Sequence, residues 1–414
     1  MKRWMAVLGV LALPVWAFGP LEALAYQSPE LGPAQAALEG ARQRAGAANL
    51  GLSSNLSVGR SDDTNNYSLG VNWQWNFTGR IDAALAVGRA ERQVRQVRRD
   101  GQKNALLAHA NLWQAQSRVA SSAKRLEVAR VRLSVTQQRV ALGAVSAVLQ
   151  EEVALAVRQA ELTQRQAQSS LIGTRAEAAR YGLSGDALPQ TVRFALPEVG
   201  AERSPAYQEA LAAQQLAQAR LDEAVRTLLP EVSVGAGYIG SDAQIQTGAS
   251  WTGRGPGASV SLGSIPSEVS ALPVNPVTGL RPGQNEWKLS VGARVVFPLE
   301  AIAGLRQLEA ERDLATVRLQ RTLEELALRI ASARAEAALA LEGVSIAQAR
   351  LELAKRQETL MQARVQAGSA SSIEFLEAQA GLFEAETGVA QAWQGYIVAS
   401  AAYLDLTDGE WSVQ

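Results

Sequence analysis

The feature that most constrains the fold is an internal repeat, because a chain that holds one unit twice builds its structure from two equivalent halves. The segment SPELGPAQAALEGARQRAGAANLGLSSNLSVG (28–59) aligns without a gap with SPAYQEALAAQQLAQARLDEAVRTLLPEVSVG (204–235). Both segments open with a Ser-Pro helix-start signal and close on a Ser-Val-Gly strand. We therefore expect each unit to run helix, strand, loop, strand, long helix, glycine turn, helix. The expected boundaries are 26–198 for the first repeat, 199–405 for the second and 406–414 for a C-terminal tail.

Each repeat is expected to contribute two strands, because apolar residues alternate with small or polar ones in NYSLGVNWQWNF (66–77) and EWKLSVGARVVF (286–297). The four expected strands cover 50–60, 66–77, 231–240 and 286–297. The segment between the last two (241–285) is rich in Gly, Ser and Pro and is expected to be a long loop. The apolar face of the strands carries Tyr67, Leu69, Val71, Trp73, Trp75, Trp287, Leu289 and Val291.

The remainder of the chain is predicted to be helical over long distances. Two apolar lines at seven-residue spacing run through each long segment, one of them made by Leu112, Val119, Leu126, Leu133 and Val140. Paired lines of this kind indicate antiparallel coiled-coil helices. The expected long helices cover 80–140 and 300–365. At 1.5 Å per residue, about 60 residues make a rod of roughly 90 Å.

Two matching turns are expected at the ends of these long helices. RVALGAVS (139–146) aligns with RVQAGSAS (364–371), so Gly143 and Gly368 occupy equivalent positions at which the chain reverses. A serine three residues on, Ser146 or Ser371, is placed to cap the helix that returns. The expected return helices cover 146–181 and 371–404. Arg139 and Arg364 precede the turns and are placed near the C-terminal ends of their helices.

Composition excludes several classes of function. The formal net charge of the 414 residues is +0, and no basic stripe interleaved with aromatic residues points to nucleic acid. The chain has no cysteine and one histidine, which excludes thiolate sites and a histidine-based metal site. We expect no metal, no cofactor and no enzymatic activity. His109 is expected to be an exposed or interhelical residue.

The N-terminal sequence predicts export from the cytoplasm. Lys2 and Arg3 precede an apolar run, and Ala23-Leu24-Ala25 is a small-x-small cleavage site. This pattern is typical of a secretory signal peptide over 1–25, which would leave a mature chain that begins near Tyr26. No later segment is apolar enough for a transmembrane helix.

The aromatic strands suit an outer-membrane barrel, because their length and their apolar outward face match those of membrane-spanning strands. Four strands cannot close a barrel, and lipid does not tolerate open sheet edges, so several chains would have to share one barrel. For the strands taken alone, a soluble four-stranded sheet packed on helices is the alternative.

With these elements in place, the sequence resembles the TolC-like outer-membrane efflux proteins. The resemblance rests on the doubled unit and on three segments, which are LLPEVSVGAGY (228–238), LSVGARVVFPLEAIAGLRQLEAERDLA (289–315) and RVQAGSASSIEFLEAQAGLFEAE (364–386). It implies a mainly α fold with a small β part, in which each protomer of a homotrimer gives four strands to a shared β-barrel that an α-helical barrel continues into the periplasm. It also implies an outer-membrane location, contact with outer-membrane lipid, and a passive duct that docks onto a periplasmic adaptor (membrane-fusion) protein and an inner-membrane pump or ABC transporter.

The resemblance further implies a periplasmic constriction lined by acidic residues. Glu374 and Glu377 match the family's positions after the second turn, and their three-residue spacing places both on one helix face. In a trimer they would form a negative ring in which crowding raises their pKa values. In the first repeat Glu152 matches Glu377, whereas Leu149 stands opposite Glu374. The alternative is that these are ordinary solvated glutamates.

The same resemblance implies contact with the adaptor at the two turns. The residues concerned are Gly143, Ser146, Gly368, Ser371, Arg139 and Arg364. A structural coiled-coil protein that bridges envelope layers without conducting is the alternative function, although it leaves the aromatic strands unexplained. A soluble adaptor would need globular β domains that these strands do not supply. The sequence does not indicate which cargo passes through such a duct, and the long loop either covers its outer mouth or adds strands.

Overall fold

The chain forms two compact units, and each draws on both sequence repeats. The computed structural model describes residues 17–50, 52–61, 64–74, 77–183, 185–228, 231–239, 243–252, 255–264, 286–294 and 299–413. Unit 1 takes the chain up to Leu31, Arg95–Ser204 and the chain from Leu326 on, and unit 2 takes Gly32–Val94 and Pro205–Glu325. The turn-bearing parts of both repeats thus share one unit, and the strand-bearing parts share the other.

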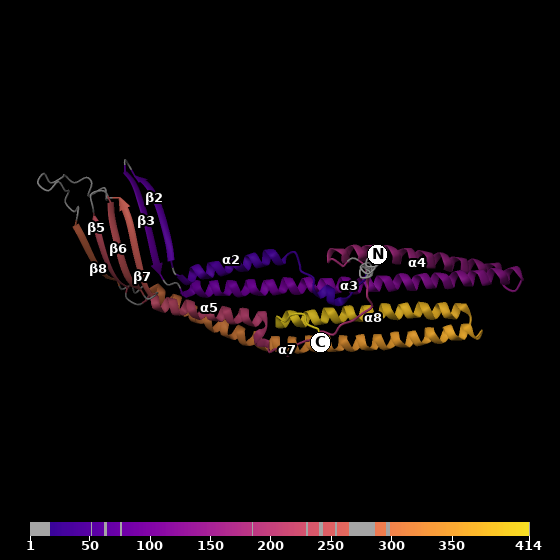
Figure 1. Ribbon diagram of the computed structural model, residues 1–414. Coiled ribbons are helices and arrows are strands. Elements are labelled where there is room, and N and C mark those ends of the chain that lie inside the picture. Colours follow the sequence, from indigo (N-terminus) through magenta and orange to yellow (C-terminus); the bar gives the residue numbers. More distant parts are fainter. Residues whose placement is uncertain are drawn as a thin grey trace, which may run out of the picture. The chain divides into compact units, whose positions relative to one another are not determined.

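Four long helices carry most of the structure (Figure 1). The segments expected over 80–140 and 300–365 are α3 (Phe77–Ala141) and α7 (Leu299–Gln366). The expected return helices are α4 (Ala147–Arg180) and α8 (Ser372–Thr407). No helix within the described residues is both long enough and apolar enough to cross a membrane.

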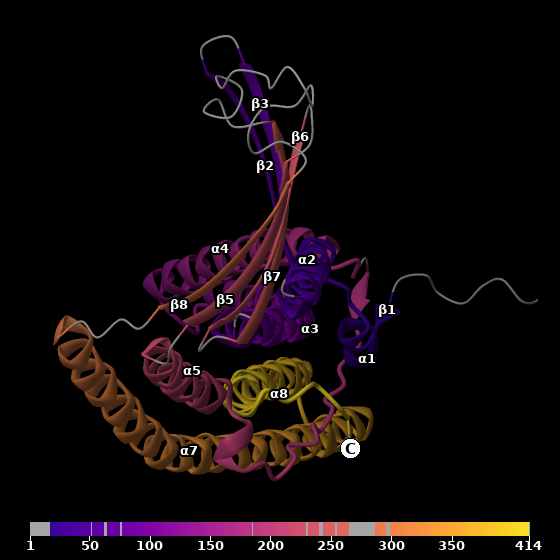
Figure 2. The same cartoon turned by 90° about the vertical axis from the view of Figure 1, so that its left-hand side faces the viewer.

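Unit 2 is built around one antiparallel sheet of six strands, seen as a twisted layer in Figure 2. The strands lie in the order β2-β3-β7-β6-β5-β8. Their bounds are Leu52–Ser61 for β2, Thr64–Gln74 for β3, Glu231–Ile239 for β5, Ala243–Thr252 for β6, Gly255–Ser264 for β7 and Glu286–Arg294 for β8. The expected strand ends at 75–76 and 295–297 lie outside the described residues, and Phe77 begins α3.

The expectation of four strands per protomer is wrong, because the segment expected as a loop over 241–285 contains β6 and β7. These two strands form a hairpin that lies between β3 and β5 in the sheet. The hairpin is rich in Gly, Ser and Gln, and small residues weaken the alternating pattern that reveals a strand. The remainder of the expected loop, 265–285, lies outside the described residues.

Helices adjoin the sheet in unit 2. They are α2 (Leu31–Leu50), α5 (Pro205–Thr227) and the first parts of α3 and α7. Ion pairs join them: Arg42 of α2 lies 3.0 Å from Glu91 of α3 within the first repeat, and Arg92 of α3 lies 3.7 Å from Glu209 of α5 in the second repeat. Ion pairs of side chains that remain partly in contact with solvent contribute little to stability.

The core of unit 1 lies between α3 and α8 and is closed by the segment that follows α4. Trp393, Tyr396 and Tyr403 of α8 are fully buried, and Phe194 stacks on Tyr396 with ring centroids 5.3 Å apart. His109 is also fully buried, edge-on to Trp393 at 5.5 Å. The histidine is therefore an interhelical core residue rather than an exposed one.

The N-terminal segment of the described chain packs into unit 1. The short strand β1 (Ala17–Phe18) pairs in parallel with β4 (Asp186–Ala187), and the helix α1 (Pro20–Leu24) follows. Ala23 is fully buried, and Gln102 Nε2 donates to the carbonyl of Leu24 over 2.7 Å. The expected cleavage near Tyr26 stays a prediction, and residues 1–16 lie outside the described chain.

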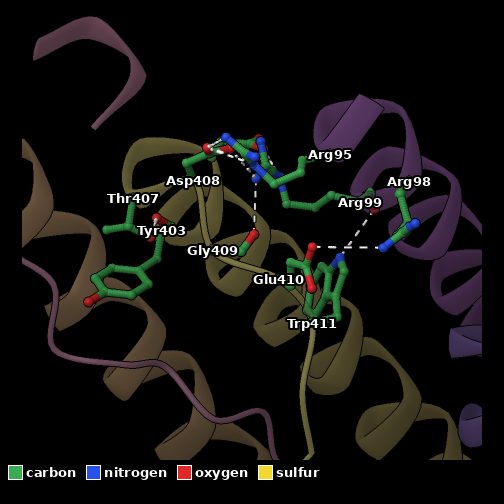
Figure 3. A network of polar contacts seen from close by, with 10 residues as sticks. Arg95, Arg98, Arg99, Tyr403, Thr407, Asp408, Gly409, Glu410 and Trp411 are labelled. Carbon is green, nitrogen blue, oxygen red and sulfur yellow. Dashed lines mark hydrogen bonds and ion pairs between the residues drawn. The ribbon is translucent and has the colours of Figure 1, made fainter. Parts of the chain in front are cut away.

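The C-terminal segment is held on α3 by a polar network (Figure 3). Arg99, which is 5% exposed, donates from Nε to Asp405 Oδ1 over 2.7 Å and from Nη1 to the carbonyl of Gly409 over 3.0 Å. Arg95 Nε donates to Asp408 Oδ2 over 2.9 Å, and Trp411 Nε1 donates to the carbonyl of Arg99 over 3.1 Å. The expected tail over 406–414 is thus in part the end of α8 and in part a packed extension.

Candidate functional site

The two turns that join the long helices have the same backbone. Gly143 and Gly368 adopt φ values of 70° and 71°, in the left-handed region that favours glycine. The residue after each glycine donates its N–H over 2.8 Å to the carbonyl of Arg139 or Arg364. This bond spans the turn and satisfies a carbonyl at the end of the helix. The chain therefore reverses at the two positions that the sequence predicts. At each one a glycine adopts a positive φ, and a hydrogen bond to the carbonyl of Arg139 or Arg364 closes the turn.

The serine caps of the two turns differ in completeness. Ser146 Oγ accepts from the N–H of Leu149 over 3.4 Å. Ser371 Oγ accepts from the N–H of Glu374 over 3.3 Å, while Glu374 Oε2 accepts from the N–H of Ser371 over 2.7 Å. The second turn therefore has a full capping box, and the first lacks its acidic member because Leu149 stands there.

The capping box determines the electrostatics of Glu374. Hydrogen bonds from the backbone and side chain of Ser371 lower the pKa of the Glu374 carboxyl, and the nearby charge of Arg364 lowers it further. The crowding of copies was expected to raise this pKa. Within one protomer the direction is the opposite, so Glu374 remains charged at a pH at which an ordinary glutamate begins to protonate.

Glu377 has a different partner, because it forms an ion pair with Arg132 of α3. One heptad further along α8, Glu384 Oε1 accepts from Arg125 Nε over 2.7 Å and from Ser121 Oγ over 3.1 Å. Two acid–base pairs thus join α8 to α3 at a seven-residue spacing. Arg125 and Arg132 were not identified from the sequence as partners of these glutamates. The two arginines are seven residues apart, as are Glu377 and Glu384, and this shared spacing is the signal that could have revealed the pairs.

These ion pairs border a groove of about 450 Å³ between α3, α4 and α8. Val128 of α3 and Val153 and Ala156 of α4 give the groove an apolar lining. Its charged members are Arg125, Arg132, Glu377 and Glu384. Glu152, the residue expected to match Glu377, is exposed on α4 next to Val153. The structure therefore pairs Glu377 with Arg132 at the border of the groove, whereas Glu152 is exposed on the surface of α4.

A further acidic group lies on α8 beyond this cluster. Burial raises the pKa of the Glu386 carboxyl, and Ser117 Oγ of α3 donates to it over 3.3 Å. Glu374 and Glu386 thus lie on one helix with pKa values displaced in opposite directions. Sequence reasoning did not single out Glu386, because its burial depends on the packing of α8 against α3.

The sheet of unit 2 exposes an apolar face. On β8, Trp287, Leu289 and Val291 have 71%, 80% and 79% of their side chains exposed. The register of the sheet places Tyr67, Leu69, Val71 and Trp73 on β3, with Leu69 and Val71 directly opposite Leu262 and Val260 of β7. Trp75 lies outside the described residues. Apolar residues as exposed as these three on β8 mark a surface that contacts another apolar phase or partner.

Comparisons with known proteins agree with this architecture. The family described as outer membrane efflux protein matches residues 196–402. No curated protein matches the sequence.

Three solved structures share the fold. The crystal structure of CusC, described in terms of transmembrane channel formation, matches with a TM-score of 0.56 at 16% identity, covering 94% of this chain and 91% of that chain. The CmeC outer membrane channel of Campylobacter jejuni matches with a TM-score of 0.55 at 14% identity, covering 95% and 85%. The outer membrane protein VceC of Vibrio cholerae matches with a TM-score of 0.54 at 15% identity, covering 94% and 95%.

At these identities the likeness to solved structures shows the fold, a mainly helical chain with a small antiparallel sheet. The family match establishes the family of this chain, because it covers half of the chain. The chain belongs to the outer membrane efflux protein family, and it is a channel protein of the outer membrane that extends into the periplasm, not an enzyme.

Proposed function

We propose that three copies of this chain form a passive exit duct, which works with a periplasmic adaptor and an inner-membrane pump or ABC transporter to export small molecules or proteins. The observation that carries the proposal is a pair of exposed heptad lines on two of the long helices. On α4 the line comprises Val148, Leu155 and Leu162. On α7 it comprises Leu339, Ile346, Leu353 and Leu360.

The two lines have the spacing needed to pack against each other between copies. Counted from the turn glycines, the α4 residues lie 5, 12 and 19 positions away and the α7 residues lie 8, 15, 22 and 29 positions away. If the turns of neighbouring copies lie at the same level, the side chains of one line fit between those of the other, as in a coiled coil. Contacts from one surface to a different surface of the next copy form a ring when the rotation between copies closes, as it does in the proposed trimer.

The acidic residues beyond the second turn support a role in selecting ions. Three copies would gather Glu374 and Glu377 around one axis, where a ring of carboxylates favours cations. The intact capping box and the Arg132 ion pair hold both side chains in fixed positions. Adaptor contact is proposed at the turns themselves, through Gly143, Ser146, Gly368, Ser371, Arg139 and Arg364, with the groove between α3, α4 and α8 beside them.

The test combines oligomeric mass with single-channel conductance of the purified protein in a planar bilayer. We expect a trimer with discrete, cation-preferring openings. Glu374→Gln with Glu377→Gln is expected to leave the trimer intact and reduce cation selectivity. The matched control, Glu324→Gln with Glu342→Gln, removes the same charge from exposed positions on α7 and is expected to leave selectivity unchanged.

Two outcomes would count against the proposal. A monomer or elongated dimer that never conducts would favour the structural coiled-coil alternative. A correctly assembled trimer that conducts with unchanged selectivity in the double variant would remove Glu374 and Glu377 from the constriction, while leaving the duct itself in place.

A further inference from the structure

The hairpin of β6 and β7 is fully integrated into the sheet. β7 pairs with β3 from Leu69↔Leu262 to Gln74↔Gly257, and β6 pairs with β5 from Val232↔Trp251 to Ile239↔Gln244. Without the hairpin, β3 and β5 would be the strands that face each other at this point in the sheet order. The hairpin therefore separates the strands of the first repeat from those of the second.

The apolar face of the sheet continues through the hairpin, although Thr247 of β6 and Ser54 of β2 are polar positions on it. Residues that pair directly share a face of the sheet. One row across all six strands, from β8 to β2, is apolar at every position: Trp287, Tyr238, Ile245, Leu262, Leu69 and Leu56. A second row, four residues further along β8, is also apolar at every position: Val291, Val234, Ala249, Ala258, Trp73 and Leu52. The row midway between them on this face has four apolar and two polar members: Leu289, Ala236, Thr247, Val260, Val71 and Ser54.

The opposite face is equally continuous. The row directly next to the second apolar row faces the other way and contains only small or polar residues: Ser290, Gly235, Gly248, Ser259, Asn72 and Ser53. Space on this face is tight in the described part, because a Cβ built on Gly235 would lie 2.7 Å from Ser290 Oγ. The hairpin thus has the same two-faced pattern, in the same register, as the four strands around it. A hairpin that merely covered a mouth would have no reason to keep this register.

Length and exposure agree with a membrane-spanning role for the hairpin. The six strands have 9 to 11 residues, the length that crosses a bilayer at a tilt. Ile245 and Trp251 of β6 are exposed on the same face as Val234 of β5 and Val291 of β8. β2 and β8 are the terminal strands, and open edges of this kind are not stable in lipid, so each edge needs a strand from a second copy.

The register points to a wider barrel: we infer that the β6–β7 hairpin is part of the barrel wall, so that three copies of a six-stranded sheet close an 18-stranded barrel through pairing of β2 with β8 of the next copy. The inference rests on the proposed trimer. Four strands per copy would give 12. Because barrel diameter grows roughly linearly with strand number, the barrel is about 1.5-fold wider than one built without the hairpin.

Cysteine cross-linking in the full-length protein tests the position of the hairpin, since the chain has no cysteine of its own. Val71→Cys with Val260→Cys places two thiols at directly paired positions of β3 and β7. A short bifunctional thiol reagent is expected to join them within one chain in the membrane. The matched controls combine Val71→Cys with Val232→Cys, Val234→Cys or Ala236→Cys of β5, and they are expected not to react.

A deletion tests the width. Ile239 pairs with Glu286, so residues 240–285 can be replaced by an Asn-Gly turn that joins β5 directly to β8. Electron microscopy of the assembled proteins in lipid nanodiscs is expected to show a barrel about 1.5-fold narrower for the deletion variant than for the intact chain.

The possible results separate this inference from the proposed function. A trimer in which Val71→Cys reacts with a β5 thiol, or whose barrel keeps its diameter after the deletion, would overturn the inference and leave the duct in place. A protein that forms the β3–β7 cross-link but never a trimer would overturn the proposed function, and the count of 18 strands with it.

Discussion

The two return helices, α4 and α8, follow nearly identical turns and have nearly the same length, yet they are packed very differently. α4 has 34 residues and buries two of them, Val157 and Ala178. α8 has 36 residues and buries twelve. The repeat therefore determines the path of the backbone in both halves, whereas the side chains decide which helix becomes core and which remains at the surface.

The physical difference lies in where the apolar residues stand. In α8 the large aromatic residues Trp393, Tyr396 and Tyr403 point into unit 1, where Phe194 and Trp411 complete the cluster. In α4 the heptad line that begins at Val148 is exposed within the protomer. An exposed apolar heptad line of this kind marks an interaction surface, and we propose that another copy covers it. On the proposed assembly, equivalent elements of the repeat serve folding in the second half and contact between copies in the first.

The largest expected effect comes from truncating the core of α8. Trp393→Ala removes a fully buried side chain whose Nε1 lies 3.4 Å from the carbonyl of Val192, so we expect the free energy of unfolding to fall by about 3–5 kcal/mol. Urea unfolding followed by circular dichroism measures it. Ile172→Ala, at an exposed position of α4, is the control and is expected to change it by less than about 0.5 kcal/mol. Similar losses for the two variants would remove the contrast between the helices.

The second effect is on assembly. Leu155→Glu places a charge in the middle of the α4 line, and the loss of one buried leucine contact of about 1.5–3 kcal/mol weakens association by roughly 10- to 100-fold. Native mass spectrometry across a dilution series measures the shift from trimer to monomer. Circular dichroism is expected to show an unchanged helix content, because this side chain is exposed within the protomer. A trimer as stable as that of the unmodified chain would show that the α4 line is not an interface.

A smaller effect is expected at the turns. Ser371→Ala removes one half of a complete capping box, at a cost of about 1 kcal/mol, whereas Ser146→Ala removes a single longer hydrogen bond and is expected to cost about 0.5 kcal/mol. Thermal unfolding of the two variants under the same conditions gives the ranking. The reverse order would mean that the first turn, despite Leu149, is the better stabilised one.

The smallest effects are pH-dependent and have opposite signs for two glutamates of α8. The pKa of Glu374 is lowered, so its contribution to stability is present above the ordinary glutamate pKa of about 4.3 and is lost as the pH falls through its own lower value. The pKa of Glu386 is raised by burial, so its ionisation costs stability as the pH rises above 4.3.

We therefore expect Glu374→Gln to lower the unfolding midpoint at pH 7 and to flatten its fall in acid, and Glu386→Gln to raise the midpoint at pH 7. Unfolding midpoints measured from pH 3 to 7 test both signs. Parallel pH profiles for the two variants would contradict the assignment.

Much of the helical architecture could be predicted from the sequence, because it depends on local patterns. The glycines at 143 and 368 occupy turns with positive φ, and the long helices begin and end within a few residues of their expected positions. In α3 the structure buries Leu112 and Leu126, two members of the predicted apolar line. The exposed line of Leu339, Ile346, Leu353 and Leu360 was not predicted, although its seven-residue spacing is present in the sequence.

The remaining features depend on contacts between distant segments. Arg132 and Glu377 are 245 residues apart, and no local pattern pairs them. The β6–β7 hairpin was only one of two alternatives for the long segment. Its alternation begins at Ile245 and ends at Trp251, but Gly248, Gly257 and the serines around them weaken it. The C-terminal extension was expected as a simple tail, because the Arg99 network that holds it depends on α3.

The measurement that tests the central claim most directly is a cross-link between the α4 line of one copy and the α7 line of the next. Two differently tagged chains, one with Leu155→Cys and one with Leu353→Cys, are co-expressed, since these positions lie 12 and 15 residues from their turn glycines. A short bifunctional thiol reagent is expected to join the two tagged chains covalently. A purified trimer in which these thiols never react between chains would contradict the claim that α4, unlike α8, serves assembly.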